Sequence, residues 1–387
     1  MLVSRAMDPA VLVEKCEIEP LLGNRLGPVR VTLDAAAQAL DTLETAEAPV
    51  LRARVMLRLA QLKMVENDYE AADRALEAVG RHVPDHAALR FLTGVRACRV
   101  AIRRGPEQRA EAGKLLVSTA ARVPQFDDGD PIWQRVSIEL AIAIAEHEIH
   151  EQTPDPDAFE PLRQIVDSLA GDPAHVDTIF AGGQLLAAFE LGRGDLDNGA
   201  RALRTVIKVA HEAASPADEV EARLALAGVL LEQGDHVTQL EASVQTKRAL
   251  ETATEHGLGT LQQAALLAQA GLLAEEGKTA AAIDRVLELA RGAAADKDLP
   301  RYVAAVAIMA ELYARRGDHV SAFRTIAEAS HALTVATGQD AAPLFREPLA
   351  RLRDRIGEAK LAKIADDVAK ANRLADEIGG KTTNDPS

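Results

Sequence analysis

Short turn sequences recur along the 387 residues of this chain, each between two long apolar stretches. Four of these turns, at Gly194, Gly234, Gly277 and Gly317, are separated by 40, 43 and 40 residues, and an earlier one is centred on Asn67. The 127 residues from Asn67 to Gly194 leave room for three such units. A fixed period of this size is typical of a repeat array, in which each unit buries its apolar face against its neighbours.

Small residues flank these turns at constant spacing, which indicates helix pairs. The small residues seven positions before the five turns are Ala60, Ala187, Ala227, Ala270 and Ala310. In four units another small residue lies five positions after the turn: Ala72, Gly199, Ala282 and Ala322. Small side chains at these places let two antiparallel helices approach closely. Aromatic residues make up only 3% of the chain, which argues against a β-sandwich or barrel.

The pattern of small residue, Gly-Asp turn and small residue resembles the tetratricopeptide repeat, most clearly over residues 56–84 and 306–329. The period near 40 exceeds the family's roughly 34 residues, as in the long-helix form found in bacterial regulators and adaptors. Gln239 replaces one small residue, and the family's closing proline is mostly missing. The resemblance implies an all-α, right-handed superhelical solenoid of about seven antiparallel helix pairs with capping helices at both ends.

The repeat divides the chain into four parts. Residues 1–49 are predicted as an N-terminal segment, irregular to residue 31 and followed by a capping helix with Thr32 as its N-cap. Residues 50–337 form the repeat domain, residues 338–378 a C-terminal capping helix that is either continuous or broken near Gly357, and residues 379–387 a disordered tail.

The C-terminal helix is amphipathic. Its apolar stripe alternates at three and four residues and comprises Leu361, Ile364, Val368, Ala371, Ala375 and Ile378. Two interpretations are open for this stripe: it covers the exposed face of the last repeat, or it mediates self-association or docking to a partner.

Charge and composition exclude several classes of protein. The net charge of −15 disfavours binding to nucleic acid. The longest apolar run, residues 140–145, is too short to cross a membrane, and no secretory signal is evident. Cys16 and Cys98 are isolated, which indicates neither a disulfide framework nor a thiolate metal site. We therefore expect a cytoplasmic protein.

No motif predicts catalysis, a cofactor or a metal site. His147 and His150 are three positions apart rather than the four of a zinc-binding helix, and the spacing indicates no third ligand. The chain also lacks a nucleophile motif and a constellation of carboxylates. We predict that it is not an enzyme.

A cluster of arginines forms a candidate secondary site. Arg96, Arg99 and Arg103 fall on one helical face at positions i, i+3 and i+7, and ten acidic residues follow between 127 and 160. The arginines of one unit either face the acids of the next and stabilise the stack, or form a basic face for an anionic partner.

The resemblance implies that the first helix of each pair lines a concave groove. The positions that would face this groove are Ala181, Gln184, Ala188, Glu221, Leu224, Gly228, Ala264, Leu267, Gly271, Ala304, Ala307 and Glu311. The Lys, Arg and Asn with which the family clamps a carboxylate are absent there. Ala188, Gly228 and Gly271 form a column of small residues that would admit a partner helix, apolar with some basic residues. Alternatively, the longer helices rotate this column into the core.

The sequence thus predicts a scaffold or adaptor that binds a segment of another protein, without nucleic acid, membrane insertion or cofactor. The alternative is a regulator whose superhelix changes shape when a ligand or peptide binds. Neither the partner nor the pathway can be predicted from these residues.

Overall fold

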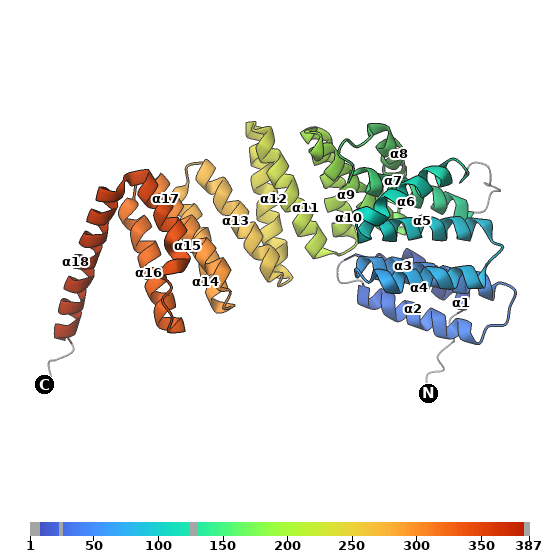
Figure 1. Ribbon diagram of the computed structural model, residues 1–387, viewed down its shortest axis with the longest axis horizontal. Helices are drawn as coiled ribbons and strands as arrows, with labels where there is room; N and C mark the ends of the chain where they lie inside the picture. The colour runs from blue at the N-terminus through green and yellow to red at the C-terminus, as the bar shows by residue number, and fades with distance from the viewer. Residues whose placement is uncertain (1–7, 23–25, 124–130, 383–387) are drawn as a thin grey trace. The chain divides into compact units, whose positions relative to one another are not determined.

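The computed structural model describes residues 8–22, 26–123 and 131–382, those from 372 onward through their backbone alone (Figure 1). Over these residues the chain forms eighteen α-helices, short 3-10 turns and no β-strand. The helices follow one another as antiparallel pairs, so the prediction of an all-α, tetratricopeptide-like repeat is confirmed. None of the described helices combines the length and apolar composition that a bilayer-spanning segment requires.

The helices group into two compact units, residues 1–245 and 246–387, with the boundary inside α12 (His236–Glu255). The first unit begins with α1 (Pro9–Ile18), α2 (Leu26–Asp41), α3 (Ala48–Val65), α4 (Tyr69–His82), α5 (Ala87–Arg104) and α6 (Pro106–Ala120). It continues with α7 (Pro131–Glu148), α8 (Glu160–Leu169), α9 (Val176–Gly192), α10 (Leu196–Glu212) and α11 (Pro216–Gln233). The second unit contains α13 (Gly259–Glu275), α14 (Thr279–Ala295), α15 (Leu299–Arg315), α16 (His319–Thr337), α17 (Arg346–Ile356) and α18 (Glu358–Thr382).

The recurring turns have the geometry that their residues favour. Gly194, Gly277 and Gly317 have φ of 82°, 77° and 83°, in the left-handed region where glycine carries no steric penalty. Asn67 occupies the same region with φ 59°. After Asn67, Gly194 and Gly317 the next residue is an aspartate that caps the following helix: the Asp318 carboxylate, for example, accepts a hydrogen bond from the Ser321 backbone N–H at 3.0 Å.

The small residues beside the turns pack where the two helices of each pair meet. The five alanines before the turns are at most 5% exposed, and Ala72, Ala282 and Ala322 are fully buried. At Gly199 an added Cβ would lie 2.4 Å from the Leu191 side chain, so only glycine fits without rearrangement. The small-residue spacing therefore predicted real interhelical contacts.

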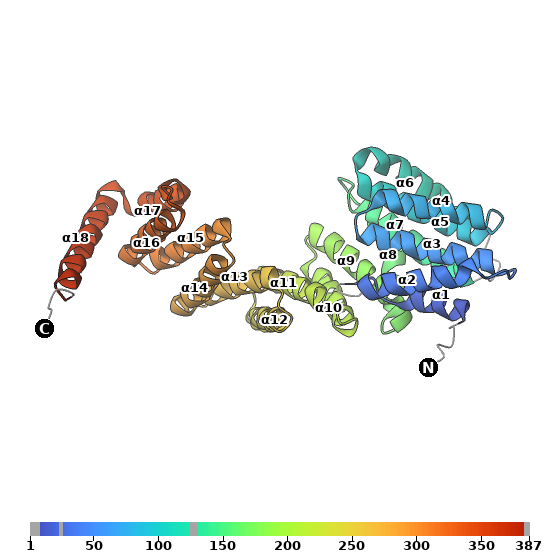
Figure 2. The ribbon, with the colours of Figure 1, turned by 90° about the horizontal axis from the view of Figure 1, so that it is seen from below.

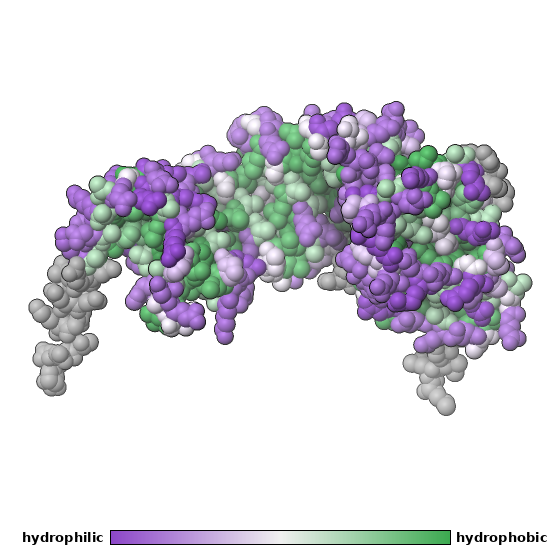
Figure 3. Space-filling view, in the orientation of Figure 1, coloured by the Kyte–Doolittle hydropathy of each residue, from purple (hydrophilic) through white to green (hydrophobic). Residues whose placement is uncertain are grey.

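In the first unit, α1 to α6 lie as three successive layers of helix pairs (Figures 1 and 2). A hydrophobic core runs from α3 to α7 and includes the chain's single tryptophan, Trp133. The α7–α8 connection contains a 3-10 turn, η3 (Pro156–Phe159), and α8 is short. Hydrophilic residues cover much of the visible surface around α3 and α4 (Figure 3).

In the second unit, α13 to α17 share one hydrophobic core. Gly357, with φ 83°, separates α17 from α18, so the predicted C-terminal helix is a pair of helices. Ile364 and Val368 of the apolar stripe are 7% and 6% exposed in this unit, where α18 contacts α16 and α17. This part of the stripe has the packing expected of a cap. Self-association through α18 stays a prediction.

Three boundary predictions need correction. Residues 1–31 are not irregular throughout, because they contain α1 and the start of α2. Thr32 is not an N-cap: it lies inside α2, and its hydroxyl donates to the Pro28 carbonyl at 3.1 Å. Pro28 is compatible with this start, since a proline in the first helical turn leaves no hydrogen bond unmade. At the other end α18 includes residues 379–382, and 383–387 lie outside the described residues.

Candidate binding site

Every position predicted to face the groove is at least partly exposed. The exposed positions in the first unit are Gln184, Ala188, Glu221 and Gly228, and in the second unit Ala264, Leu267, Gly271 and Ala304. The half-buried positions are Ala181, Leu224, Ala307 and Glu311. An added Cβ at Gly228 or Gly271 would meet no atom within 4 Å. The alternative that the small-residue column is rotated into the core is therefore wrong.

Helix geometry explains this exposure. Ala187, Ala227 and Ala270 face the core, and each next residue is rotated by about 100° around its helix. That rotation turns Ala188, Gly228 and Gly271 away from the core and towards solvent. Within each unit, the surface formed by the predicted positions is called the first-helix face of that unit.

In the second unit the chain itself covers part of the first-helix face. Arg355 of α17 donates to the Glu311 carboxylate at 2.7 Å, and Arg315 donates to the same oxygen at 3.0 Å. Ala307 and Glu311 also border a small gap of about 20 Å³ between α15 and α17. These two positions are less available to a partner than Ala264 or Gly271.

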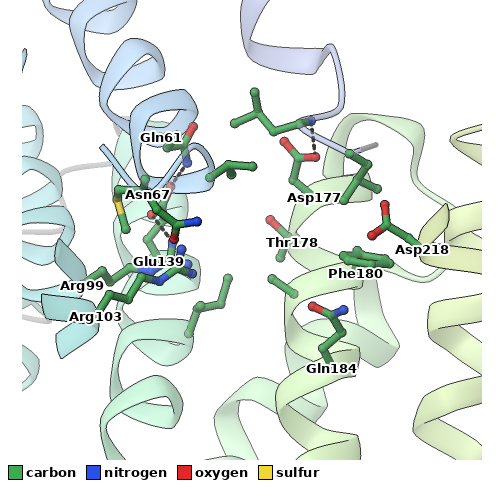
Figure 4. Close-up of a pocket in the computed structure, with 16 residues that line it drawn as sticks. Gln61, Asn67, Arg99, Arg103, Glu139, Asp177, Thr178, Phe180, Gln184 and Asp218 are labelled. Carbon is green, nitrogen blue, oxygen red and sulfur yellow. Dashed lines mark hydrogen bonds and ion pairs between the residues drawn. The ribbon is translucent and has the colours of Figure 1, made fainter. Parts of the chain in front are cut away.

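The first unit contains a pocket of about 360 Å³ that the sequence did not predict (Figure 4). Side chains from α3, α5, α7, α9 and α11, the first helices of five successive pairs, line it together with the connection between α1 and α2. Ala181 and Gln184 of the first-helix face belong to its lining. The first helices therefore do form a concave site within this unit.

One wall of the pocket is built on buried ion pairs between α5 and α7. The Glu139 carboxylate accepts hydrogen bonds from Arg96, from Arg99 at 3.1 Å and from the Gln61 amide at 2.7 Å. Arg99 also donates twice to Glu146, at 2.7 and 2.8 Å, and Arg103 donates to Glu146 at 2.6 Å. Shared hydrogen bonds of this kind hold charged side chains in fixed positions.

The electrostatics of this wall keep its groups ionised. Burial opposes ionisation of Glu139, but attraction to Arg96 and Arg99 outweighs it and holds the pKa of this carboxyl at about 2. Burial lowers the pKa of Arg96 to about 10, and its charge persists because Glu139 faces it. Burial also lowers the pKa of Arg99, but the attraction of the Glu146 and Glu139 carboxylates is stronger and raises this pKa above its ordinary value.

The predicted basic face on Arg96, Arg99 and Arg103 requires correction. Arg96 is fully buried and Arg99 is 8% exposed, so they present no basic face to a partner. The structure agrees with the first interpretation, in which arginines of one repeat, on α5, pair with acids of the next repeat, on α7. Arg103, with 32% of its side chain exposed, is the one of the three that reaches the solvent side of the pocket.

The opposite wall comes from α9 and α11. Asp177 accepts a hydrogen bond from the Leu21 backbone N–H at 2.7 Å and from Arg58 at 3.0 Å. Asp218, in the first turn of α11, is half-buried and accepts a hydrogen bond from the Ser215 hydroxyl. Phe180 supplies an apolar surface on the same side. Figure 4 shows these residues across the pocket from Arg99 and Arg103.

Sequence reasoning missed Glu139, Asp177 and Asp218 as site residues. Glu139 and Glu146 are seven positions apart on one helix, as are Arg96 and Arg103, and this match was a usable signal. Asp177 and Asp218 carried no such signal, because nothing in their local sequence indicates which partner they meet. Within the described residues, no group of His, Cys, Asp and Glu side chains has the arrangement of a metal site.

No protein-family model and no curated protein matches the sequence. Among solved structures, the chain is similar to a Signal Transduction ATPase with Numerous Domains (STAND) protein with a tetratricopeptide repeat sensor from Pyrococcus horikoshii. The identity is 12% and the TM-score 0.49, over 91% of this chain and 54% of that one, so this chain spans about half its length.

Two further similar structures match over nearly their whole length. One is a Rap protein complexed with Competence and Sporulation Factor, at 14% identity and TM-score 0.45, covering 94% of this chain and 99% of that one. The other is aspartyl phosphate phosphatase F from Bacillus subtilis, at 13% identity and TM-score 0.43, covering 91% of this chain and 95% of that one. The tetratricopeptide-like architecture described above rests on the helix pairs of this chain.

Proposed function

We propose that this chain is a non-catalytic protein-interaction module, a scaffold or adaptor, that binds a segment of a partner protein on the first-helix face. The observation that carries the proposal is the exposure of Ala188 and Gly228 in the first unit, with open space beside Gly228. Small residues on a helix surface let a second backbone approach closely. A partner helix is therefore the segment that this surface fits best.

The residues around the column indicate the chemistry of the partner. Leu224, half-buried on α11 of the first unit, offers apolar contact. Glu221 is an exposed carboxylate on α11, and the chain as a whole carries a net charge of −15. Opposite charge favours both encounter and orientation. We expect an amphipathic partner segment with apolar and basic residues.

The test compares two double variants with the wild type. Ala188→Arg with Gly228→Arg places two long charged side chains on the first-helix face. Gly80→Arg with Ala280→Arg places the same side chains at exposed positions of second helices, on α4 and α14. Each of the three proteins is crosslinked to its partners in native lysate. A protein captured by the wild type and by the control, but not by the first variant, is then purified and titrated against all three.

The proposal predicts that a purified partner binds the wild type and the control equally and the first variant at least about tenfold more weakly, because arginine blocks close approach. Circular dichroism must show equal helicity in all three. A partner that binds the first variant as tightly as the wild type contradicts the proposal.

A second candidate function is a ligand-responsive regulator. The pocket of the first unit favours it, because one ligand there would touch the first helices of five successive pairs. This function predicts that a pocket ligand changes the radius of gyration measured by solution scattering, whereas a scaffold keeps one shape on binding.

A further inference from the structure

The pocket of the first unit is electrically polarised. Arg99 and Arg103 lie on the wall formed by α5 and α7, while Asp177 and Asp218 lie on the wall formed by α9 and α11 (Figure 4). Each wall contains groups already paired within the protein. The charges that remain uncompensated decide which ligand the pocket can hold.

The α5–α7 wall retains a positive charge. Three guanidinium groups, those of Arg96, Arg99 and Arg103, share two carboxylates, those of Glu139 and Glu146. Within the described part of the chain, Arg103 donates only through Nη2, to Glu146, which leaves donors on Nε and Nη1. A guanidinium with free donors is a strong partner for a carboxylate.

The α9–α11 wall retains a negative charge. Asp177 is neutralised by Arg58, whose side chain is 2% exposed. Asp218 faces no cation among the described residues: its contact is with the Ser215 hydroxyl. The neighbouring Glu219 is paired with Arg223 and His211 and does not line the pocket. Asp218 is therefore available to a protonated amine or guanidinium.

The space between the walls has a mixed lining, to which apolar and polar side chains contribute about equally. Leu22, Met64, Ile142 and Phe180 line it, and the Gln184 amide makes no hydrogen bond to any described residue of the chain. A volume of about 360 Å³ lies at the lower end of the range for small-ligand pockets. These dimensions suit a few residues of peptide with one or two apolar side chains.

We infer that this pocket binds a short zwitterionic peptide, with a free carboxylate at Arg103, a cationic group at Asp218 and apolar side chains between them. The inference builds on the proposed function, since it gives the interaction module a specific ligand class. A free peptide and the carboxyl-terminal tail of a protein with a nearby lysine both carry this chemistry.

The probe is a mixture of synthetic tetrapeptides with randomised residues, prepared in free, N-acetylated and C-amidated forms. Peptides retained by the 387-residue protein at 1:1 stoichiometry are identified by native mass spectrometry and then titrated individually. Charge pairing in the pocket predicts that amidation weakens binding by about tenfold or more, because the Arg103 contact is lost. Acetylation has the same effect on peptides whose only cation is the α-amine.

Two variants assign the ends of the peptide. Arg103→Gln is expected to bind acid and amide equally while still preferring the free amine. Asp218→Asn is expected to lose the preference for the free amine while still preferring the acid. A merely misfolded protein loses both preferences, and Arg103→Lys, which keeps the charge, retains the preference for the acid. Asp167→Asn, an exposed carboxylate on α8, is the matched control and binds as the wild type.

To distinguish the two sources, the selected peptide is also fused to the carboxyl terminus of a carrier protein, which removes its free α-amine. A pocket that recognises protein tails still binds this fusion, whereas a pocket that requires a free peptide does not. Retention of no tetrapeptide at 1 mM, or equal binding of free and blocked forms, overturns the inference. Such a result leaves the proposed function standing if Ala188→Arg with Gly228→Arg still weakens partner binding at least about tenfold. Loss of both effects overturns both.

Discussion

Arg58 and Asp177 are 119 positions apart in the sequence, yet Nη2 of Arg58 donates to Oδ2 of Asp177 at 3.0 Å. The other Asp177 oxygen accepts the Leu21 backbone N–H at 2.7 Å, and Arg58 also donates to the Cys16 and Glu19 carbonyls. One carboxylate thus joins α3, α9 and the connection between α1 and α2. Since Leu21 lines the pocket, this junction also fixes one of its edges.

Replacing Asp177 by Asn is expected to destabilise the first unit by about 1–3 kcal/mol, the cost of losing charged hydrogen bonds to a buried group. The fluorescence of Trp133, the single tryptophan and 2% exposed in this unit, reports its unfolding in urea. Asp167→Asn removes an exposed carboxylate and should leave the midpoint unchanged. Equal midpoints for both variants would show that the junction contributes no stability.

The buried Glu139 predicts a specific dependence of stability on pH. Its pKa is about 2 in the folded chain, against 4.5 for an ordinary glutamate. As the pH falls from about 4.5 towards 2, the unfolded state takes up a proton that the folded state does not, so the stability contributed by Glu139 is lost. At neutral pH, Glu139→Gln leaves Arg96 without its charge partner and should cost about 3–5 kcal/mol.

The measurement is urea unfolding of the wild type and Glu139→Gln at pH 7 and pH 3, followed through Trp133. The difference between the two proteins should narrow at pH 3, because the wild type has lost part of its advantage there. Acid sensitivity should persist in the variant through Glu146, whose pKa is also lowered, with burial outweighed by Arg99 and Arg103. A difference that stays constant with pH would contradict the ionised state of Glu139.

The helix pairs could be predicted from sequence because their determinants are local. A turn residue in the left-handed region and small residues at fixed distances from it lie within one unit. The ion pairs between α5 and α7 could also have been found. Arg96 meets Glu139 across 43 positions and Arg103 meets Glu146 across 43, close to the repeat period. Applying the period to the charges would have paired them.

The pocket could not be predicted in the same way. The junction of Arg58 with Asp177 spans several helix pairs of the first unit, and the repeat period does not relate the two residues. Leu21 reaches α9 because residues 9–18 and 26–41 form two helices that pack beside α3, whereas the sequence indicated only one helix there. Long-range pairing between non-equivalent positions leaves no trace in repeat spacing.

Glycine substitutions should separate packed from open positions. At Gly199 a Cβ would lie 2.7 Å from Cγ of Leu191, so Gly199→Ala forces a shift that costs about 1–3 kcal/mol and exceeds the gain in helix propensity. At Gly228 nothing lies within 4 Å, and Gly228→Ala should stabilise by about 0.5–1 kcal/mol. The stability of both variants is measured as the midpoint of urea unfolding. If Gly199→Ala stabilised the protein, α9 and α10 would be packed less tightly than the structure indicates.

The last prediction concerns two neighbours on α9. Ala187 is 3% exposed and faces the core, whereas Ala188 is exposed on the first-helix face. Ala187→Arg buries an unpaired charge and should cost about 3–5 kcal/mol, enough to lower the unfolding midpoint sharply. Ala188→Arg points into solvent and should shift stability by at most about 0.5 kcal/mol. If Ala188→Arg destabilised the first unit as strongly as Ala187→Arg, α9 would be rotated about its axis, and the surface proposed to bind a partner would lie in the core.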